Sequence, residues 1–202
     1  MVGCDSVCDR GIAVLLLLCV LATMTGCTGQ PPQVAQIEQL GGRVKLDGSG
    51  EVQWVNLGST SVSNDFLPEL QALKSLKSIN LGRTKISDEG LKHIAKLKNL
   101  TSLQIDENAI TDDGLEHLAS LDNLETLDLS LTKITDAGLA HLAEMDSLTT
   151  VVITGTSFSD AGVEHVKAIT NLKHLWCAGT RITSDGKESL EAAFPDLVIH
   201  DD

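Results

Sequence analysis

Aromatic residues are nearly absent from this sequence. Phe, Trp and Tyr together make up 2% of its 202 residues, and there is no Tyr at all. A single irregular core depends on such large side chains for much of its buried area. The composition instead favours a core of many similar small layers, because Leu dominates the apolar residues.

Basic residues are also few. The chain has 15 Lys and Arg against 28 Asp and Glu, which gives a formal net charge of -13. A surface this acidic repels the phosphates of nucleic acids and the headgroups of anionic lipids. We therefore expect no nucleic-acid partner, and membrane contact only through a separate anchor.

The sequence has no apolar run long enough to cross a bilayer comfortably. Its longest run, residues 11–25, falls short of the ~20 residues that a transmembrane helix needs and suits the hydrophobic region of a signal peptide. Residues 24–27 (MTGC) resemble a bacterial lipobox, in which the cysteine is lipidated after cleavage. We expect a signal peptide over residues 1–26, a lipid on Cys27 and a tether over residues 27–32. An ordinary signal peptide or an uncleaved anchor is the alternative.

This anchor predicts an exported lipoprotein of the cell envelope, with a secreted or periplasmic soluble protein as the alternative. Cysteine usage agrees, because Cys177 is the one cysteine that follows Cys27 and no disulfide can form within the folded domain. We expect Cys177 to fill a small core position rather than to act as a nucleophile.

Catalytic sequence motifs are missing as well. The chain contains no GxSxG, Walker loop, GxGxxG or HExxH. We therefore expect a protein that is not an enzyme and that binds no cofactor.

A spacing of 24 residues organises most of the chain. An earlier, less regular copy starts at Val52, and a last partial strand starts at Leu197. The aligned columns are Leu76, Leu100, Leu124, Leu148 and Leu172; Thr84, Asn108, Thr132, Thr156 and Thr180; and Gly90, Gly114, Gly138 and Gly162. Such self-similarity is the signature of a repeat architecture.

Each copy has two halves with different periods. In the copy over residues 124–147, the LxxLxL half indicates a short strand. Thr135 and Asp136 then predict a helix start. Leu139, Leu142 and Met145 follow at every third residue and place one apolar stripe inward.

The pattern resembles the leucine-rich repeat, in a bacterial variety close to the ribonuclease-inhibitor-like and cysteine-containing types. The resemblance covers about residues 52–200 and implies an α/β solenoid, a short horseshoe with parallel strands on its concave face and helices on its convex face. It also implies a binding scaffold. One column departs from the usual pattern, because Asn108 alone keeps the asparagine that bonds the loop backbone, and the Thr elsewhere reaches less far.

The remaining segments are expected to cap the solenoid. Residues 33–51 predict an N-terminal cap, with a helix over residues 33–40 and a hairpin that joins residues 44–46 to Val52. Six repeats then occupy residues 52–196. Residues 197–202 form a C-terminal cap strand and an acidic tail.

The concave face carries the expected binding site. Its outward residues form an acidic middle (Asp106, Glu107, Glu125 and Asp128) and an apolar C-terminal part (Leu131, Val152, His174 and Trp176). Trp176 is either an aromatic anchor or shielded by the C-terminal cap, while Trp54 is expected to pack in the N-terminal cap. We expect a monomer that binds a basic, partly apolar protein in a salt-sensitive way. The alternative is a structural envelope scaffold that assembles through the convex face or the solenoid ends.

Two further columns suggest metals but are expected to hold none. His93, His117, His141 and His165 recur on helices ~8–10 Å apart, whereas zinc needs its ligand atoms within a few ångströms. Acids also recur at successive helix starts, whereas calcium needs six to eight oxygens around one point. These acids are Asp88, Glu89, Asp112, Asp113, Asp136, Asp160 and Asp185. Compensation of the helix dipole is expected to explain these acids fully.

Overall fold

The computed structural model describes residues 31–202. The predictions for the signal peptide and for Cys27 lie outside these residues. Within residues 31–202, no helix is both long enough and apolar enough to cross a membrane.

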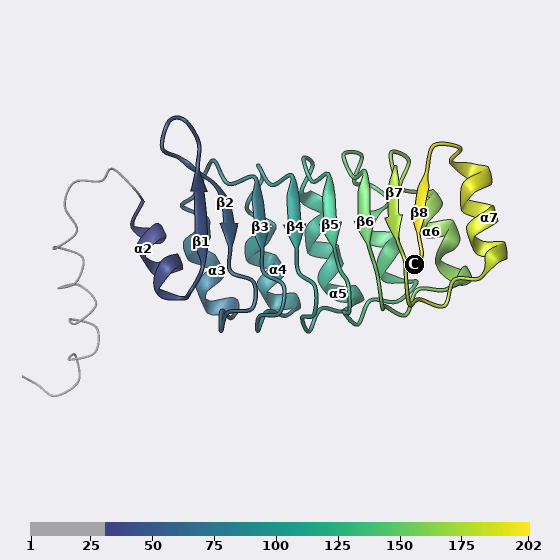
Figure 1. Cartoon of the computed structure of the whole chain (residues 1–202), viewed down its shortest axis with the longest axis horizontal. Coiled ribbons are helices and arrows are strands. Elements are labelled where there is room, and N and C mark those ends of the chain that lie inside the picture. The colour runs from purple at the N-terminus through teal and green to yellow at the C-terminus, as the bar shows by residue number, and fades with distance from the viewer. Residues whose placement is uncertain (1–30) are drawn as a thin grey trace, which may run out of the picture. The chain divides into compact units, whose positions relative to one another are not determined.

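The described chain forms an eight-stranded sheet whose strands follow chain order, with helices covering one of its faces (Figure 1). β1 (Arg43–Leu46) pairs antiparallel with β2 (Val52–Asn56). The later strands all pair in parallel: β3 (Ser78–Asn80), β4 (Ser102–Gln104), β5 (Thr126–Asp128), β6 (Thr150–Val152), β7 (His174–Trp176) and β8 (Val198–His200). We call the face without helices the open face.

The 24-residue spacing is also the register of the parallel sheet. Trp54 pairs with Ser78, Ser78 with Ser102, and so on to His174 with Val198. In β3–β7 the middle residue of the strand points to the helices and is buried, whereas its two neighbours lie on the open face. The repeat therefore produces one continuous core and two straight rows of outward side chains.

The helical halves of the repeats are short and partly 3₁₀. They comprise η2 (Asn64–Phe66), α3 (Leu67–Leu70), α4 (Asp88–Ile94), α5 (Asp112–Leu115), η3 (Glu116–Ser120), η4 (Gly138–Leu142), η5 (Asp160–Gly162), α6 (Val163–Lys167) and α7 (Ser184–Ala193). In the copy over residues 124–147, the helical half is the 3₁₀ helix η4. Its apolar residues at every third position match the three residues per turn of a 3₁₀ helix, so the spacing indicates a 3₁₀ helix rather than an α-helix.

The N-terminal cap closes the first core layer. Helix α2 (Pro32–Gln39) buries Val34 and Ile37, and the ammonium of Lys45 lies 4.7 Å from the centre of the Trp54 ring. Trp54 thus packs against the hairpin, as expected. The hairpin turn is held by Asp47, whose pKa is lowered to about 2 by the hydroxyl of Ser49 and by further hydrogen bonds.

In four repeats, an aspartate at the start of the helical half binds the next repeat. Its Oδ1 accepts the backbone N–H of a Thr or Ser 23 residues later at 2.7–2.9 Å, and its Oδ2 accepts that residue's hydroxyl at 2.5–2.7 Å. The pairs are Asp88–Thr111, Asp112–Thr135, Asp136–Ser159 and Asp160–Thr183, which we call the aspartate ladder. The helix dipole alone was therefore an incomplete explanation, because these carboxylates join successive repeats.

The glycine column exists because of this ladder. A Cβ atom on Gly114 would lie 2.3 Å from Oδ1 of Asp88, and one on Gly138 would lie 2.3 Å from Oδ1 of Asp112. Neither glycine has a positive φ. These positions need glycine for the close approach of a carboxylate rather than for backbone freedom.

Asn108 also bonds across repeats. Its Nδ2 donates to the carbonyls of Leu81, Ile105 and Asp106, and its Oδ1 accepts the backbone N–H and the hydroxyl of Thr84. The threonines at the same position donate to the carbonyl three residues earlier, as Thr132 does to Leu129 at 2.5 Å. As the sequence predicts, the asparagine reaches the neighbouring repeat and the threonine reaches only its own.

Candidate functional site

Chemistry changes along the open face. One outward row reads Asn56, Asn80, Gln104, Asp128, Val152, Trp176 and His200, and the other reads Trp54, Ser78, Ser102, Thr126, Thr150, His174 and Val198. Apart from Trp54, the outward residues of β2–β5 are polar, and Val152, Trp176 and Val198 make β6–β8 more apolar. The apolar part is unusual for a solvated sheet surface.

The apolar part is a contiguous patch on the last three strands. Trp176 is 40% exposed and Val198 45% exposed. Val152 is the register neighbour of Trp176 on β6, and His200 is its neighbour on β8. We call Val152, His174, Trp176, Val198 and His200 the Trp176 patch.

His200 covers one side of the tryptophan. The two rings stack with centroids 3.7 Å apart and an interplanar angle of 8°, and the His174 ring lies 5.8 Å from that of His200. Nε2 of His200 is buried and has no hydrogen-bond partner within the described chain. Both readings of Trp176 therefore hold in part: the cap strand shields it, yet much of the indole remains accessible.

Val198 and His200 were expected in the C-terminal cap strand and not in the site. The 24-residue spacing does predict them, because adding 24 to His174 and Trp176 gives these two positions. The strand β8 continues the register of β7.

Leu131 lies just beyond the end of β5 and is doubly unusual. Its side chain is 55% exposed, and its φ is +55°. The corresponding residues of the next two repeats, Gly155 and Gly179, also have positive φ. A left-handed backbone costs a non-glycine residue roughly 1–2 kcal/mol, so Leu131 combines backbone strain with exposed apolar surface.

Replacing Leu131 with glycine is expected to raise the free energy of unfolding by about 1 kcal/mol, because the strain of the left-handed conformation disappears. Urea denaturation measures the effect. Leu131→Ala is the control, since it removes the exposed side chain but keeps the strain. If the glycine variant were no more stable than the alanine variant, Leu131 would not be strained.

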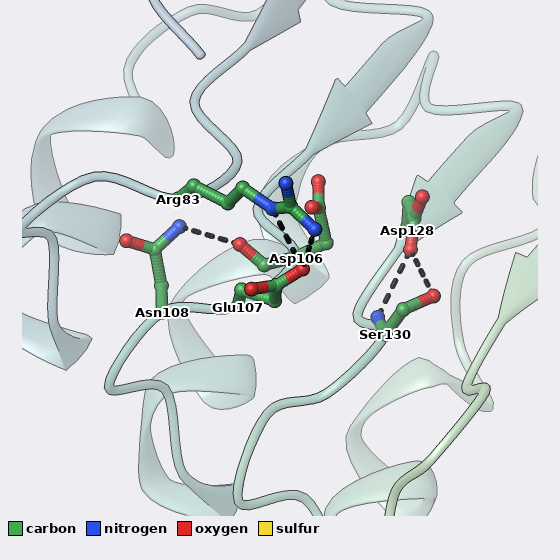
Figure 2. Close-up of polar contacts among 6 residues, drawn as sticks. All are labelled: Arg83, Asp106, Glu107, Asn108, Asp128 and Ser130. Atoms are coloured by element: carbon green, nitrogen blue, oxygen red, sulfur yellow. Dashed lines mark hydrogen bonds and ion pairs between the residues drawn. The ribbon is translucent and has the colours of Figure 1, made fainter. Parts of the chain in front are cut away.

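The acidic residues divide into different groups. Nη2 and Nε of Arg83 lie 2.5 and 2.7 Å from Oε1 of Glu107, so the charge of Glu107 is paired (Figure 2). Oδ1 of Asp128 accepts the backbone N–H and the hydroxyl of Ser130. Burial raises the pKa of Asp106, and the neighbouring Asp128 and Glu107 raise it further.

Glu125 does not join this group. It precedes β5, whereas Asp106 and Glu107 follow β4, so they lie at opposite ends of the parallel strands. The structure thus corrects the expected single acidic cluster. Asp106 and Asp128 are the carboxylates at the strand ends that lack a paired base, because the Arg83 guanidinium binds Glu107.

Two shallow polar hollows were not anticipated. One, of ≈ 270 Å³, lies at the strand ends and is lined by Asn56, Gly58, Ser59, Asn80, Gly82, Arg83 and Asp106. The other, of ≈ 420 Å³, lies at the strand starts and includes Glu125. Polar columns in the repeat were the signal, but they show no hollow until the side chains are placed.

The histidine column and Cys177 lie away from the open face. His93, His117, His141 and His165 are half-buried on the helical side, and no group of three or more potential ligands in residues 31–202 is placed to hold a metal ion. Cys177 is buried in the core, as predicted, and burial raises the pKa of its thiol.

Comparison with known families agrees with this geometry. Models of the leucine-rich repeat match residues 98–158 and residues 72–95. The fold is a leucine-rich-repeat solenoid. The fold class predicted from the 24-residue spacing is thereby confirmed.

Several solved structures share the leucine-rich-repeat fold. An internalin (InlF) from Listeria monocytogenes is 20% identical with a TM-score of 0.52, over 73% of this chain and 46% of that one. Internalin C2 from the same bacterium is 20% identical with a TM-score of 0.55, over 87% and 88%. The Arabidopsis receptor kinase HAESA, solved with the peptide hormone IDA and the co-receptor SERK1, is 21% identical with a TM-score of 0.57, over 78% and 27%.

The chain therefore spans less than half of InlF and of HAESA. No curated protein matches its sequence. At these identities the similarity of this chain to solved structures concerns the fold, and its function has to be argued from its own surface.

Proposed function

We propose that this solenoid is a non-enzymatic protein-interaction module that binds its partner through the Trp176 patch. The observation that carries the proposal is the contiguous exposed apolar surface of β6–β8, on a chain whose other outward strand residues are mainly polar. Exposed apolar patches of this kind mark interaction sites, and tryptophan is a frequent anchor of binding energy.

The geometry favours binding over catalysis. The parallel strands are about 4.8 Å apart, so the outward rows form a broad, open surface. Such a surface excludes water poorly, whereas catalytic sites gain from excluding it. It does present rigid side chains to a loop or helix of another protein.

The charges near the patch indicate the partner's chemistry. Asp128 lies in the same outward row as Trp176, two strands away, which is about 10 Å. The pKa of Asp106 is raised first by burial and then by the negative charge of Asp128. A partner with a basic group about 10 Å from a large apolar side chain would relieve this repulsion and cover the tryptophan, and its association would weaken in salt.

Export and anchoring complete the proposal. Lipidation of Cys27 would leave residues 28–31 between the membrane and helix α2. Even with residues up to 32 counted, an extended segment of this length reaches roughly 15–20 Å. The module would then present its open face close to a cell-envelope membrane.

Affinity capture from a native envelope extract tests the proposal. The bait carries Cys27→Ser so that it stays soluble, and it is compared with the same bait carrying Trp176→Ala and Val152→Asp. We expect the first bait to enrich a protein that the second loses by at least tenfold, because the apolar anchor is gone. Raising the salt concentration should also release this protein.

Trp54→Ala is the matched control, since Trp54 is an aromatic residue on the same face at the opposite end of the sheet. It should leave capture unchanged. Equal capture by the patch variant would exclude the Trp176 patch, and concentration-dependent self-association in sedimentation would favour an envelope scaffold instead. A Cys27→Ser bait that stayed in the membrane fraction would contradict lipidation.

A further inference from the structure

The larger hollow lies at the strand starts, away from the Trp176 patch. It has a volume of ≈ 420 Å³ and spans four repeats along the rim of β2–β5, so we call it the rim hollow. Its lining is Gln53, Lys74, Ser75, Lys77, Asn99, Thr101, Asn123, Glu125 and Ser147. Every one of these side chains is polar, which is uncommon for a pocket that binds an apolar ligand.

Five side chains of this lining are held by hydrogen bonds that they donate to the protein. These bonds are Gln53 Nε2 to Asp47 Oδ2, Asn99 Nδ2 to the Lys74 carbonyl, Thr101 Oγ1 to the Lys77 carbonyl, Asn123 Nδ2 to the Lys98 carbonyl and Ser147 Oγ to the Asp122 carbonyl. Four of these bonds join successive repeats, 24 or 25 residues apart. They fix the side chains in place.

These side chains still offer both acceptors and donors. Each amide keeps its carbonyl oxygen and its second N–H, and each hydroxyl that donates keeps its lone pairs. No described protein donor binds these oxygens. Because the repeats are about 4.8 Å apart, equivalent groups recur along the rim at that interval, and a ligand with many hydroxyls satisfies them because a hydroxyl both donates and accepts.

Two lysines provide the positively charged donors of the hollow. Lys74 and Lys77 both line it, and neither takes part in the ion pairs of residues 31–202, which use Arg83, Lys92, Lys167 and Lys187. Glu125 lines the hollow too, so the lining carries two positive charges and one negative charge, a net charge of +1 in a chain of net charge -13. The two ammonium groups therefore form a local site for an anion. Each ammonium group carries three donors.

We propose that the rim hollow binds an acid sugar, that is, a polyhydroxylated carboxylate, either free or as a unit of a glycan chain. The sugar carboxylate lies between Lys74 and Lys77, and its hydroxyls donate to the fixed oxygens of Asn99, Thr101 and Asn123. Recognition is by hydrogen bonds and charge, without aromatic stacking. The rim hollow lies at the starts of β2–β5, whereas the Trp176 patch lies on β6–β8, so the two sites can be tested independently.

The test follows backbone amide NMR shifts of the purified chain during titration with sodium D-glucuronate and with tetragalacturonate. D-Glucose controls for the carboxylate and sodium acetate for the hydroxyls. We expect glucuronate to shift the amides of Gln53, Lys77 and Thr101 and to bind at least tenfold more tightly than glucose or acetate. Tighter binding of tetragalacturonate identifies a glycan chain, and equal affinity per site identifies a free acid sugar.

Matched variants locate the site. Lys74→Met with Lys77→Met keeps the aliphatic stems and should weaken glucuronate binding about tenfold, as expected for lost charge-assisted hydrogen bonds. Thr101→Val removes one acceptor and should weaken it about threefold. Lys173→Met is the control, because Lys173 occupies the same repeat position as Lys77, outside the hollow.

Several outcomes would overturn the proposal. They are the absence of shifts at the rim at millimolar glucuronate, acetate or glucose binding as well as glucuronate, and unchanged affinity in the double lysine variant. Loss of capture in the Trp176 variant with intact sugar binding, or the reverse, would separate the two surfaces.

Discussion

Replacing Gly114 with alanine is expected to lower the free energy of unfolding by about 3 kcal/mol. The new Cβ would lie 2.3 Å from Oδ1 of Asp88 and 3.1 Å from Cδ1 of Leu91. The carboxylate must then move, which breaks its two hydrogen bonds to Thr111 and strains the packing between two repeats. Urea denaturation followed by far-UV circular dichroism measures the loss.

A second alanine separates steric overlap from the general effect of adding a methyl group to a glycine. Gly48→Ala should be nearly neutral, since no atom lies within 4 Å of its added Cβ. Gly114→Ala should also cost much less when Asp88 is already alanine, because the overlapping oxygen is then absent. An undiminished effect of Gly114→Ala in the Asp88→Ala background would show that the aspartate ladder does not determine the glycine column.

Replacing Asn108 with alanine is expected to lower the free energy of unfolding by about 3 kcal/mol as well. Asn108 is buried, and its loss leaves the Ile105 carbonyl and the Thr84 N–H without their partner. The Leu81 carbonyl keeps only its bond from the Thr84 hydroxyl. Two unsatisfied buried groups at about 1–2 kcal/mol each give this magnitude. Thermal and urea unfolding provide the measurement.

The chain contains its own comparison for this prediction. Thr132→Ala should cost only about 1 kcal/mol, since Thr132 donates one bond, to Leu129 within its own repeat. Asn108→Thr should fall between the two, because it restores the local bond without the reach to Leu81. If Asn108→Ala and Thr132→Ala were equally destabilising, the bonds between repeats would contribute nothing measurable.

Sequence periodicity was sufficient for the sheet and insufficient for the bonds between repeats. The 24-residue columns predicted the parallel strands and the fold class, because register and spacing are the same quantity in a solenoid. The aspartate ladder was missed because a bond over 23 residues depends on how one helix start faces the next. This relative orientation is set by packing, and the recurring residue columns alone do not reveal it.

The sequence predicted which apolar residues share the open face, but it placed acids from opposite edges of the sheet in one group. Outward alternation placed Val152, His174 and Trp176 together, and the structure adds Val198 and His200 from β8. Glu125 was grouped with Asp106 although strand ends and strand starts are different edges of the sheet. The rim hollow required knowing which amides and hydroxyls donate within the protein, and a sequence does not state this.

The aspartate ladder gives the solenoid a direction. Every carboxylate belongs to the earlier repeat and every Thr or Ser that it holds belongs to the later one. During synthesis on the ribosome, the aspartate that binds a repeat is therefore synthesised before that repeat emerges. Each repeat within the ladder carries the Thr or Ser that binds the preceding repeat and the aspartate that binds the following one. Whole repeats can therefore be duplicated or deleted within the array, and every remaining aspartate still meets a Thr or Ser.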